Sequence, residues 1–143
     1  MEDWRTPFES MEIGKSKELR QGEDVVVLSL GTMGHIAMKA ADESKYDVAV
    51  YDMRFLKPLD EERIVDLLER YDKIITLEDG SRIGGLGSAV AELIAKKGKK
   101  SIRLITMGVP DRFVEHGTTR ELYAECDMDK QALLENIEQL MKN

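Results

Sequence analysis

VVVLSL, at residues Val25 to Leu30, is the stretch of sequence that decides the fold class. It is apolar and β-branched at both odd and even positions, a pattern typical of a strand that is buried on both faces of a parallel sheet. Residues 48–51, 74–77 and 102–106 repeat this character further along the chain. These runs predict a parallel sheet with helices covering both of its faces.

Helical patterns separate the predicted strands. After Asp60, which is expected to cap the first free amides, apolar residues recur at the spacing of one helix face: Ile64, Val65, Leu67, Leu68 and Tyr71. Three further helices are predicted, around Val90 and ended by Gly98, from Thr118 with Glu121 as its capping box, and from Lys130 with Asp129 as its N-cap.

The segment before the first buried strand completes the predicted sheet. Ile13 to Leu19, followed by Gln21-Gly22-Glu23, is expected to be an antiparallel strand whose charged residues suit a sheet edge. The predicted fold is a three-layer α/β/α domain with about five strands, mostly parallel, with the first strand antiparallel and at an edge. Residues 1–11 are predicted to be a linker or arm, and residues 12–143 a single domain.

Composition excludes several classes of function. The chain has 143 residues, one cysteine (Cys126), two histidines and a formal net charge of −7. This charge argues against nucleic acid as a partner, and the multi-cysteine patterns of zinc sites are absent. We predict no metal site and no membrane partner, because no apolar run approaches the length of a membrane span. A single cysteine suits a reducing compartment, so a cytoplasmic location is expected.

Two glycine-rich turns each allow a binding hypothesis and a packing hypothesis. Gly31-Thr32-Met33-Gly34, with Asp52 at the end of the next strand, imitates a dinucleotide site but lacks the close first glycine pair, and a tight turn is favoured. Gly84-Gly85-Leu86-Gly87-Ser88 precedes a helix whose free amides could hold an anion. No P-loop lysine follows, so close backbone packing is the favoured interpretation.

A scattered polar set could in principle supply a nucleophile, a base and an orienting acid. It consists of His35, Glu78, Asp79, Asp111, His116 and Cys126. Nothing in its spacing requires catalysis, and we predict no catalytic residue here.

Three motifs, taken together, are specific. Arg54-Phe55-Leu56-Lys57-Pro58-Leu59-Asp60, then Glu78-Asp79 leading to the Gly84–Ser88 turn, then Pro110-Asp111-Arg112-Phe113 with His116-Gly117 occur in this order. In order and spacing, from about Met11 to the end, the chain resembles the C-terminal domain of the 1-deoxy-D-xylulose-5-phosphate synthase family. Other transketolases and the β subunits of 2-oxoacid dehydrogenases are similar more loosely and remain the alternative.

The resemblance implies a parent enzyme that needs thiamine diphosphate and Mg²⁺. It would join a two-carbon unit from pyruvate to glyceraldehyde 3-phosphate, with release of CO₂, for isoprenoid synthesis by the non-mevalonate route. The family's diphosphate motif and its catalytic glutamate have no matching positions in these residues. We therefore expect this region alone to be inactive and to hold no cofactor. Its expected partners are the N-terminal and middle domains of the same enzyme, which would form a homodimer.

The loops at the carboxyl ends of the parallel strands are expected to form a docking face toward those domains. The candidate residues are Arg54, Phe55, Lys57, Glu78, Gly84, Gly85, Gly87, Asp111, Arg112, Phe113 and His116. The alternatives are that these loops only cover the sheet edge, or that the chain is a stand-alone small-molecule-binding module. The chain also departs from the family at Asp127, where glycine is common; a helix end there favours a left-handed residue, which aspartate tolerates.

Overall fold

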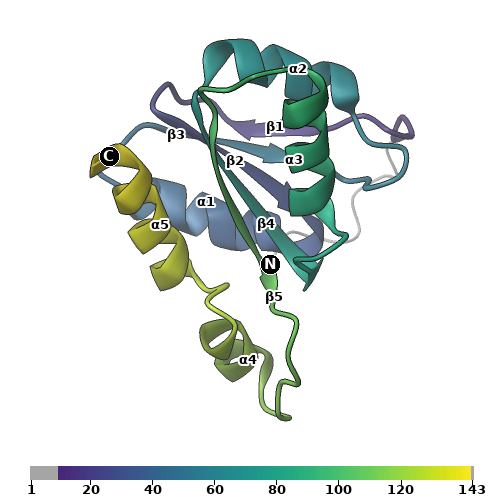
Figure 1. The fold of residues 1–143 in the computed structure, drawn as a ribbon. Coiled ribbons are helices and arrows are strands. Elements are labelled where there is room, and N and C mark those ends of the chain that lie inside the picture. The colour runs from purple at the N-terminus through teal and green to yellow at the C-terminus, as the bar shows by residue number, and fades with distance from the viewer. Residues whose placement is uncertain (1–9, 143) are drawn as a thin grey trace.

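The computed structural model describes residues 10–142; most of the predicted linker therefore lies outside the described residues. Its centre is one five-stranded sheet in the order β1-β3-β2-β4-β5 (Figure 1). The strands are β1 (Lys17–Arg20), β2 (Val25–Leu30), β3 (Val48–Asp52), β4 (Lys73–Ser81) and β5 (Arg103–Val109). β1 pairs with β3 in antiparallel fashion and all other pairs are parallel, which confirms the predicted mixed sheet with an antiparallel edge strand.

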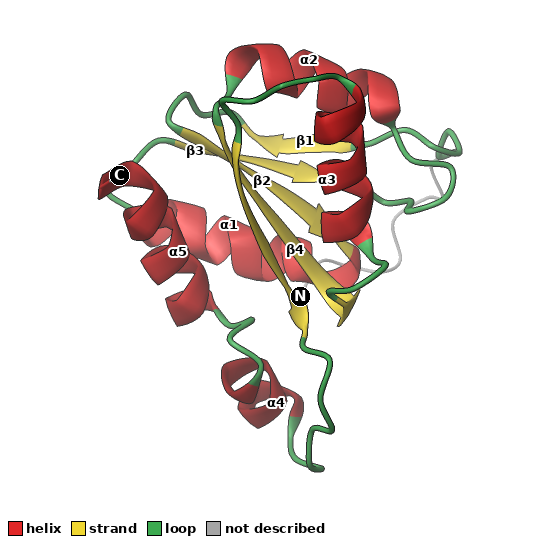
Figure 2. Cartoon of the chain, viewed as in Figure 1, coloured by secondary structure: helices red, strands yellow, loops and turns green. Residues whose placement is uncertain are grey.

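Helices cover both faces of the sheet (Figure 2). α1 and α5 lie on one face, and α2 and α3 lie on the other. A short 3₁₀ turn (Gly31–Met33) precedes α1 (Gly34–Glu43), and the remaining helices are α2 (Glu61–Arg70), α3 (Leu86–Lys96), α4 (Thr119–Glu125) and α5 (Lys130–Lys142). α4 belongs to neither layer, and none of its residues is buried. Within residues 10–142 no helix is long and apolar enough to cross a membrane.

The two cores follow from the alternation of side chains along the strands. Val25 and Val27 of β2 pack in the layer of α1 and α5, whereas Val26 and Leu28 pack against α2 and α3. All four are fully buried. A strand that feeds a core on each face must be apolar at every position, which explains why the VVVLSL pattern predicted it.

The predicted helix caps are present. The Asp60 carboxylate accepts a hydrogen bond from the Arg63 amide at 3.3 Å. Thr118 and Glu121 form a reciprocal capping box at the start of α4, and Asp129 accepts from the Ala132 amide at 2.9 Å. Asp127 has a φ of 54°, so it occupies the left-handed conformation expected at the helix end before α5.

The predicted start of the edge strand at Ile13 is wrong, because β1 begins only at Lys17. Gly14 adopts a φ of +78° in a turn, and Ile13 is 72% exposed. The backbone and hydroxyl of Ser16 both donate to Asp60 at 2.8 Å. This part of the chain is therefore held by the start of α2 instead of by the sheet.

The two edge strands of the sheet differ in character. β1 has the sequence KELR, and its pairing with β3 is irregular between Glu18 and Arg20. Charged side chains and irregular pairing are ways in which proteins protect a sheet edge from other strands. β5 has the sequence RLITMGV, with no charge after Arg103. The sheet therefore has one protected edge and one unprotected edge.

Candidate docking face at the carboxyl edge of the sheet

Most candidate docking residues lie on three loops that follow parallel strands, whereas Glu78 lies in β4 and Gly87 in α3. Residues 53–60 follow β3, residues 82–85 follow β4, and residues 110–118 follow β5. The last two loops are neighbours, because the Arg82 amide donates to the Val109 carbonyl at 3.0 Å. Strand β2 lies between β3 and β4, so the loop with Arg54, Phe55 and Lys57 follows the same edge of the sheet one strand further along. All three segments thus lie at the carboxyl edge, and the loops after β4 and β5 are in direct contact.

Glu78 is a buried carboxylate at the end of β4, and only 3% of it is exposed. Its two oxygens accept hydrogen bonds from the Leu86 amide at 2.8 Å and the Gly87 amide at 3.0 Å. Negative charge at a helix N-terminus is stabilised by the free amides and by the helix dipole. Glu78 therefore fills, from within the domain, the position at which an external anion would bind to α3.

The glycines of this turn allow two close approaches. A Cβ at Gly85 would lie 2.1 Å from a Glu78 oxygen, and a Cβ at Gly87 would lie 2.7 Å from Cγ2 of Thr106. Both glycines are buried, whereas Gly84 is exposed with a φ of +79°. Close packing thus explains the turn. The anion-binding alternative is disfavoured, because the Leu86 and Gly87 amides that would bind an anion already donate to Glu78.

The loop after β3 is shaped by local bonds. Arg54 has a φ of 58°, a conformation unusual for a residue with a side chain, and its amide donates to the Asp52 carboxylate at 3.0 Å. The Lys57–Pro58 peptide bond is cis. Arg54 and Phe55 are partly exposed and Lys57 is exposed. Asp52 therefore supports this loop by accepting from its backbone.

The first glycine turn also has a packing explanation. A Cβ at Gly34 would lie 3.4 Å from both Leu19 and the Ser29 hydroxyl, so this glycine lets the start of α1 approach the sheet. Met33, between the glycines, is fully buried. These contacts favour the tight turn over the dinucleotide site.

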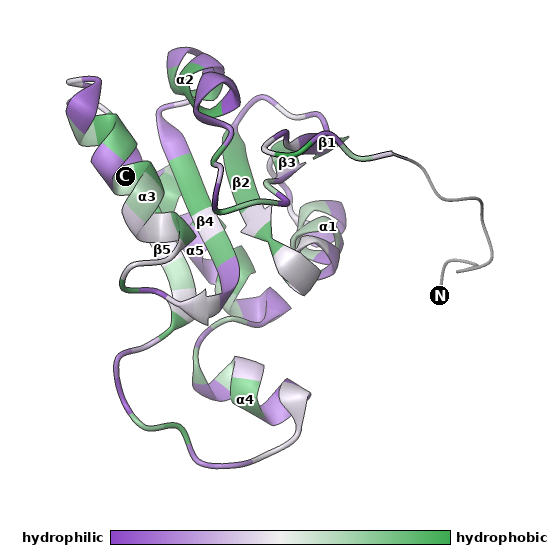
Figure 3. Ribbon diagram, turned by 90° about the vertical axis from the view of Figure 1, so that its right-hand side faces the viewer, coloured by the Kyte–Doolittle hydropathy of each residue, from purple (hydrophilic) through white to green (hydrophobic). Residues whose placement is uncertain are grey.

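The segment from Pro110 to Met128 projects from the body of the domain (Figures 1 and 3). We call residues 110–128 the arm; it is distinct from the predicted linker at residues 1–11. Phe113, near its start, is fully exposed, and Asp111 and His116 are exposed as well. Met128, which is fully buried, returns the chain to the core. The arm thus exposes a large aromatic side chain for which the domain provides no cover.

Polar contacts fix the arm both internally and to the body of the domain. Arg112 donates to the Glu125 carbonyl at 2.8 Å and forms an ion pair with its carboxylate at 2.7 Å, which closes the arm on itself. The hydrogen bond and the charge of Glu125 raise the pKa of Arg112. Tyr123 donates to Asp79 at 2.7 Å and so connects α4 to the end of β4. Beneath α4 lies a cavity of 490 Å³, lined in part by Val109, Leu122 and Met128.

The scattered polar set is not assembled into a catalytic group. Glu78 is occupied by helix amides and Asp79 by Tyr123, while His35 lies on α1. His116 and Cys126 line the cavity beneath α4. Within residues 10–142, no hydrogen bond joins two members of the set.

No observation among the described residues marks a site for thiamine diphosphate with Mg²⁺. Among them, no group of three histidines, cysteines or carboxylates could hold a metal ion. The amides at the start of α3, which could have received a diphosphate, already bind Glu78. We therefore derive no reaction step through the cofactor on this chain.

Sequence reasoning treated Asp60 only as a helix cap, and it missed the bonds from Ser16. It also missed the open edge of β5, because the sequence of a single strand does not determine its place in the strand order. No local signal would have revealed either feature.

The comparisons with known proteins agree with the fold and the motifs. The family model of the transketolase C-terminal domain matches residues 14–133. This chain belongs to the transketolase C-terminal domain family. Similar curated proteins include 1-deoxy-D-xylulose-5-phosphate synthases from Parabacteroides distasonis, 43% identical over 140 residues, and from Cytophaga hutchinsonii, 41% identical over 143 residues. These alignments cover 96% and 98% of the chain but 22% of each relative.

Two solved structures share this fold over part of longer chains. A split-gene transketolase in an inactive β4 tetramer is 31% identical with a TM-score of 0.83, and the match covers 92% of this chain and 44% of that one. Transketolase from Leishmania mexicana shares the fold with a TM-score of 0.64 at 14% identity, over 90% of this chain and 18% of that one. The resemblance to the C-terminal domain of 1-deoxy-D-xylulose-5-phosphate synthase is thus confirmed by relatives about 40% identical over nearly the whole chain.

Proposed function

We propose that this chain is the non-catalytic docking domain of a 1-deoxy-D-xylulose-5-phosphate synthase. The parent enzyme would convert pyruvate and glyceraldehyde 3-phosphate, with thiamine diphosphate and Mg²⁺ bound by its other domains. The identity of more than 40% with such synthases, over about a fifth of their length, supports this parent. The chain's own residues would bind and position those domains.

The observation that carries the docking role is the arm. Phe113 is fully exposed, and α4 has no buried residue, although the arm is tied to the body by Tyr123 and Asp79. An exposed aromatic beside an arginine is the composition found at the centre of protein interfaces. Within this face Glu78, Gly85 and Gly87 would act from inside, because they fix the turn that presents Gly84.

The occupant of this face would be the remainder of the parent chain. The split-gene relative, an inactive tetramer of its β chain, supports the view that this domain needs the rest of the enzyme for activity. The parent is proposed to act as a homodimer in the cytoplasm.

The test is the Phe113→Ser substitution in the full-length parent enzyme. We expect domain docking and synthase activity to fall, while the melting temperature of the 143-residue chain stays nearly unchanged, because the Phe113 side chain is fully exposed. Phe113→Leu, which keeps apolar bulk, should retain most activity. Lys39→Ser on α1, also exposed, is the remote control. Full activity of the Phe113→Ser enzyme would contradict the docking role.

A further inference from the structure

The open edge of β5 is the feature that the docking role leaves unexplained. In residues 10–142, β5 pairs with β4 and with no other strand. Its central residues Leu104, Ile105 and Thr106 are only partly buried, although its sequence is as apolar as that of an interior strand. Long apolar edges are a liability that proteins normally protect or cover. The charged and irregular β1 shows that this same sheet protects its other edge.

The hydrogen-bond pattern identifies which backbone groups are free. The Arg103 amide donates to the Asp72 carbonyl at 2.7 Å, and the Val109 carbonyl accepts from Arg82 at 3.0 Å. Backbone groups alternate in direction along a strand, so the odd-numbered residues of β5 face β4. The amides and carbonyls of Leu104, Thr106 and Gly108 therefore point away from β4; Leu104 and Thr106 are partly exposed, whereas Gly108 is buried.

We propose that β5 pairs with β5 of a second copy of this chain, antiparallel and centred on Thr106. In this register Thr106 lies opposite Thr106, and Leu104 lies opposite Gly108. Each outward residue meets an outward residue, so every free amide finds a free carbonyl. A two-fold axis through the Thr106 pair would join the two sheets into one.

Charge also matches in this register. The start of β5 is basic, with Lys100 just before the strand and Arg103 as its first residue, and Nη1 of Arg103 is buried without a hydrogen-bond partner among the described residues. The chain after β5 carries the exposed carboxylate of Asp111. In the antiparallel pair, Asp111 of the second copy becomes the diagonal neighbour of Arg103. The dimer would therefore place opposite charges close together at both ends of the paired β5 strands.

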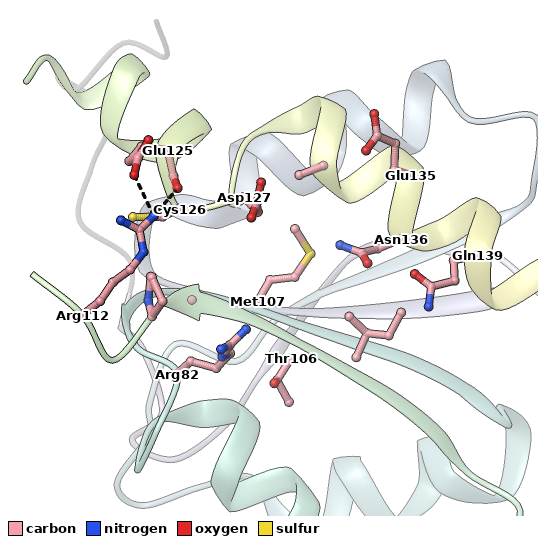
Figure 4. Close-up of a pocket in the computed structure, with 14 residues that line it drawn as sticks. Arg82, Thr106, Met107, Arg112, Glu125, Cys126, Asp127, Glu135, Asn136 and Gln139 are labelled. Carbon is pink, nitrogen blue, oxygen red and sulfur yellow. Dashed lines mark hydrogen bonds and ion pairs between the residues drawn. The ribbon is translucent and has the colours of Figure 1, made fainter. Parts of the chain in front are cut away.

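A groove lies on the α5 side of the sheet, next to this edge. It has a volume of 460 Å³, and its lining includes Ile105 and Met107 of β5 and Ala132 and Asn136 of α5; Figure 4 shows Met107 and Asn136 beside it. Ile105 and Met107 pack on the α5 side of the sheet. The two-fold axis is perpendicular to the sheet, so the α5 sides of both copies form one face. Ile105 and Met107 of the second copy would therefore lie on this face, next to the groove.

Sedimentation equilibrium of the 143-residue chain tests the proposal. We expect a dimer that Thr106→Pro weakens at least tenfold, because proline removes an outward amide and leaves the pairing with β4 intact. Arg103→Glu and Asp111→Lys should each weaken the dimer about tenfold, and the double variant should restore it. Lys17→Glu on the opposite edge is the matched control and should change nothing.

Hydrogen exchange provides the second measurement. As concentration rises through the dimer range, the amides of Leu104, Thr106 and Gly108 should become protected, while those of Ile105 and Met107 are already protected by β4. A chain that stays monomeric at millimolar concentration, or a dimer that tolerates both Thr106→Pro and the single charge reversals, overturns the proposal. Protection of these amides only within the parent enzyme, independent of concentration, would assign the edge to another strand of that enzyme and also overturn it.

Discussion

Glu78 and Asp79 are neighbours in sequence and lie in opposite environments. Glu78 is buried and accepts two helix amides, whereas Asp79 is exposed and accepts the Tyr123 hydroxyl. Glu78→Ala is expected to lower the free energy of unfolding by about 2–4 kcal/mol, because two buried amides lose a charged acceptor. Asp79→Ala should cost about 0.5 kcal/mol. Urea unfolding of both variants measures the difference, and equal losses would show that Glu78 does not hold the turn.

Asp60 makes the stability of the fold depend on pH. Burial is the largest influence on its carboxyl group and raises its pKa, but hydrogen bonds from Ser16 and Arg63 and the charge of Lys15 outweigh burial, so the pKa lies below its ordinary value of 3.8. A lowered pKa adds stability that is fully present above the ordinary value and is lost as pH falls through the folded-state pKa. The difference in unfolding free energy between wild type and Asp60→Asn should therefore shrink below about pH 4.

Glu138 provides the control for this pH dependence. Its pKa is lowered to about 2, first by the hydrogen bond from Lys142 and then by that from Lys45. Because these groups are exposed, salt should screen most of the Glu138 contribution. The acid-linked effect of Asp60→Asn should persist in 1 M salt, and that of Glu138→Gln should largely disappear. Equal salt sensitivity of the two variants would contradict the anchoring role of Asp60.

At the scale of elements, α2 and α4 differ in how far they depend on the domain core. Leu68 on α2 is 4% exposed within the core, while Leu122 on α4 is only partly buried beside a cavity. Leu68→Ala should destabilise the chain by about 2–5 kcal/mol, and Leu122→Ala by about 1 kcal/mol or less. Thermal and urea unfolding compare them. A larger loss from Leu122→Ala would mean that the arm is part of the cooperative core.

The strands and helices themselves were largely predictable from sequence, because burial on both faces requires apolar residues at every strand position and the caps require specific polar residues. The start of β1 was not predictable, since the bonds of Ser16 to Asp60 join residues 44 positions apart. The docking face stays a prediction, and the position of β2 between β3 and β4, which sets the spacing of its loops, could not be predicted. Strand order depends on how the elements pack together, which no single segment encodes.

At the scale of the whole molecule, we expect the isolated chain to fold without catalysing the synthase reaction. Both helix layers and both cores are present, whereas the described residues contain no group of three or more histidines, cysteines or carboxylates that could hold a metal ion. The measurement is CO₂ release from pyruvate and glyceraldehyde 3-phosphate in the presence of Mg²⁺ and thiamine diphosphate, against a control without protein. Saturable binding of thiamine diphosphate in calorimetry, or CO₂ release above the control, would contradict this expectation.

The charged, irregular β1 edge also determines how far an assembly of this chain can grow. If β5 is occupied in a two-fold pair, the outer borders of the joined sheet are both β1 strands, in which Lys17 and Glu18 are exposed charged residues. A third copy finds no strand to extend, so the association terminates at two and cannot propagate into a fibril. If β1 were apolar, its edge could also pair with another copy, and the chains would polymerise through β5 and β1 edges in turn.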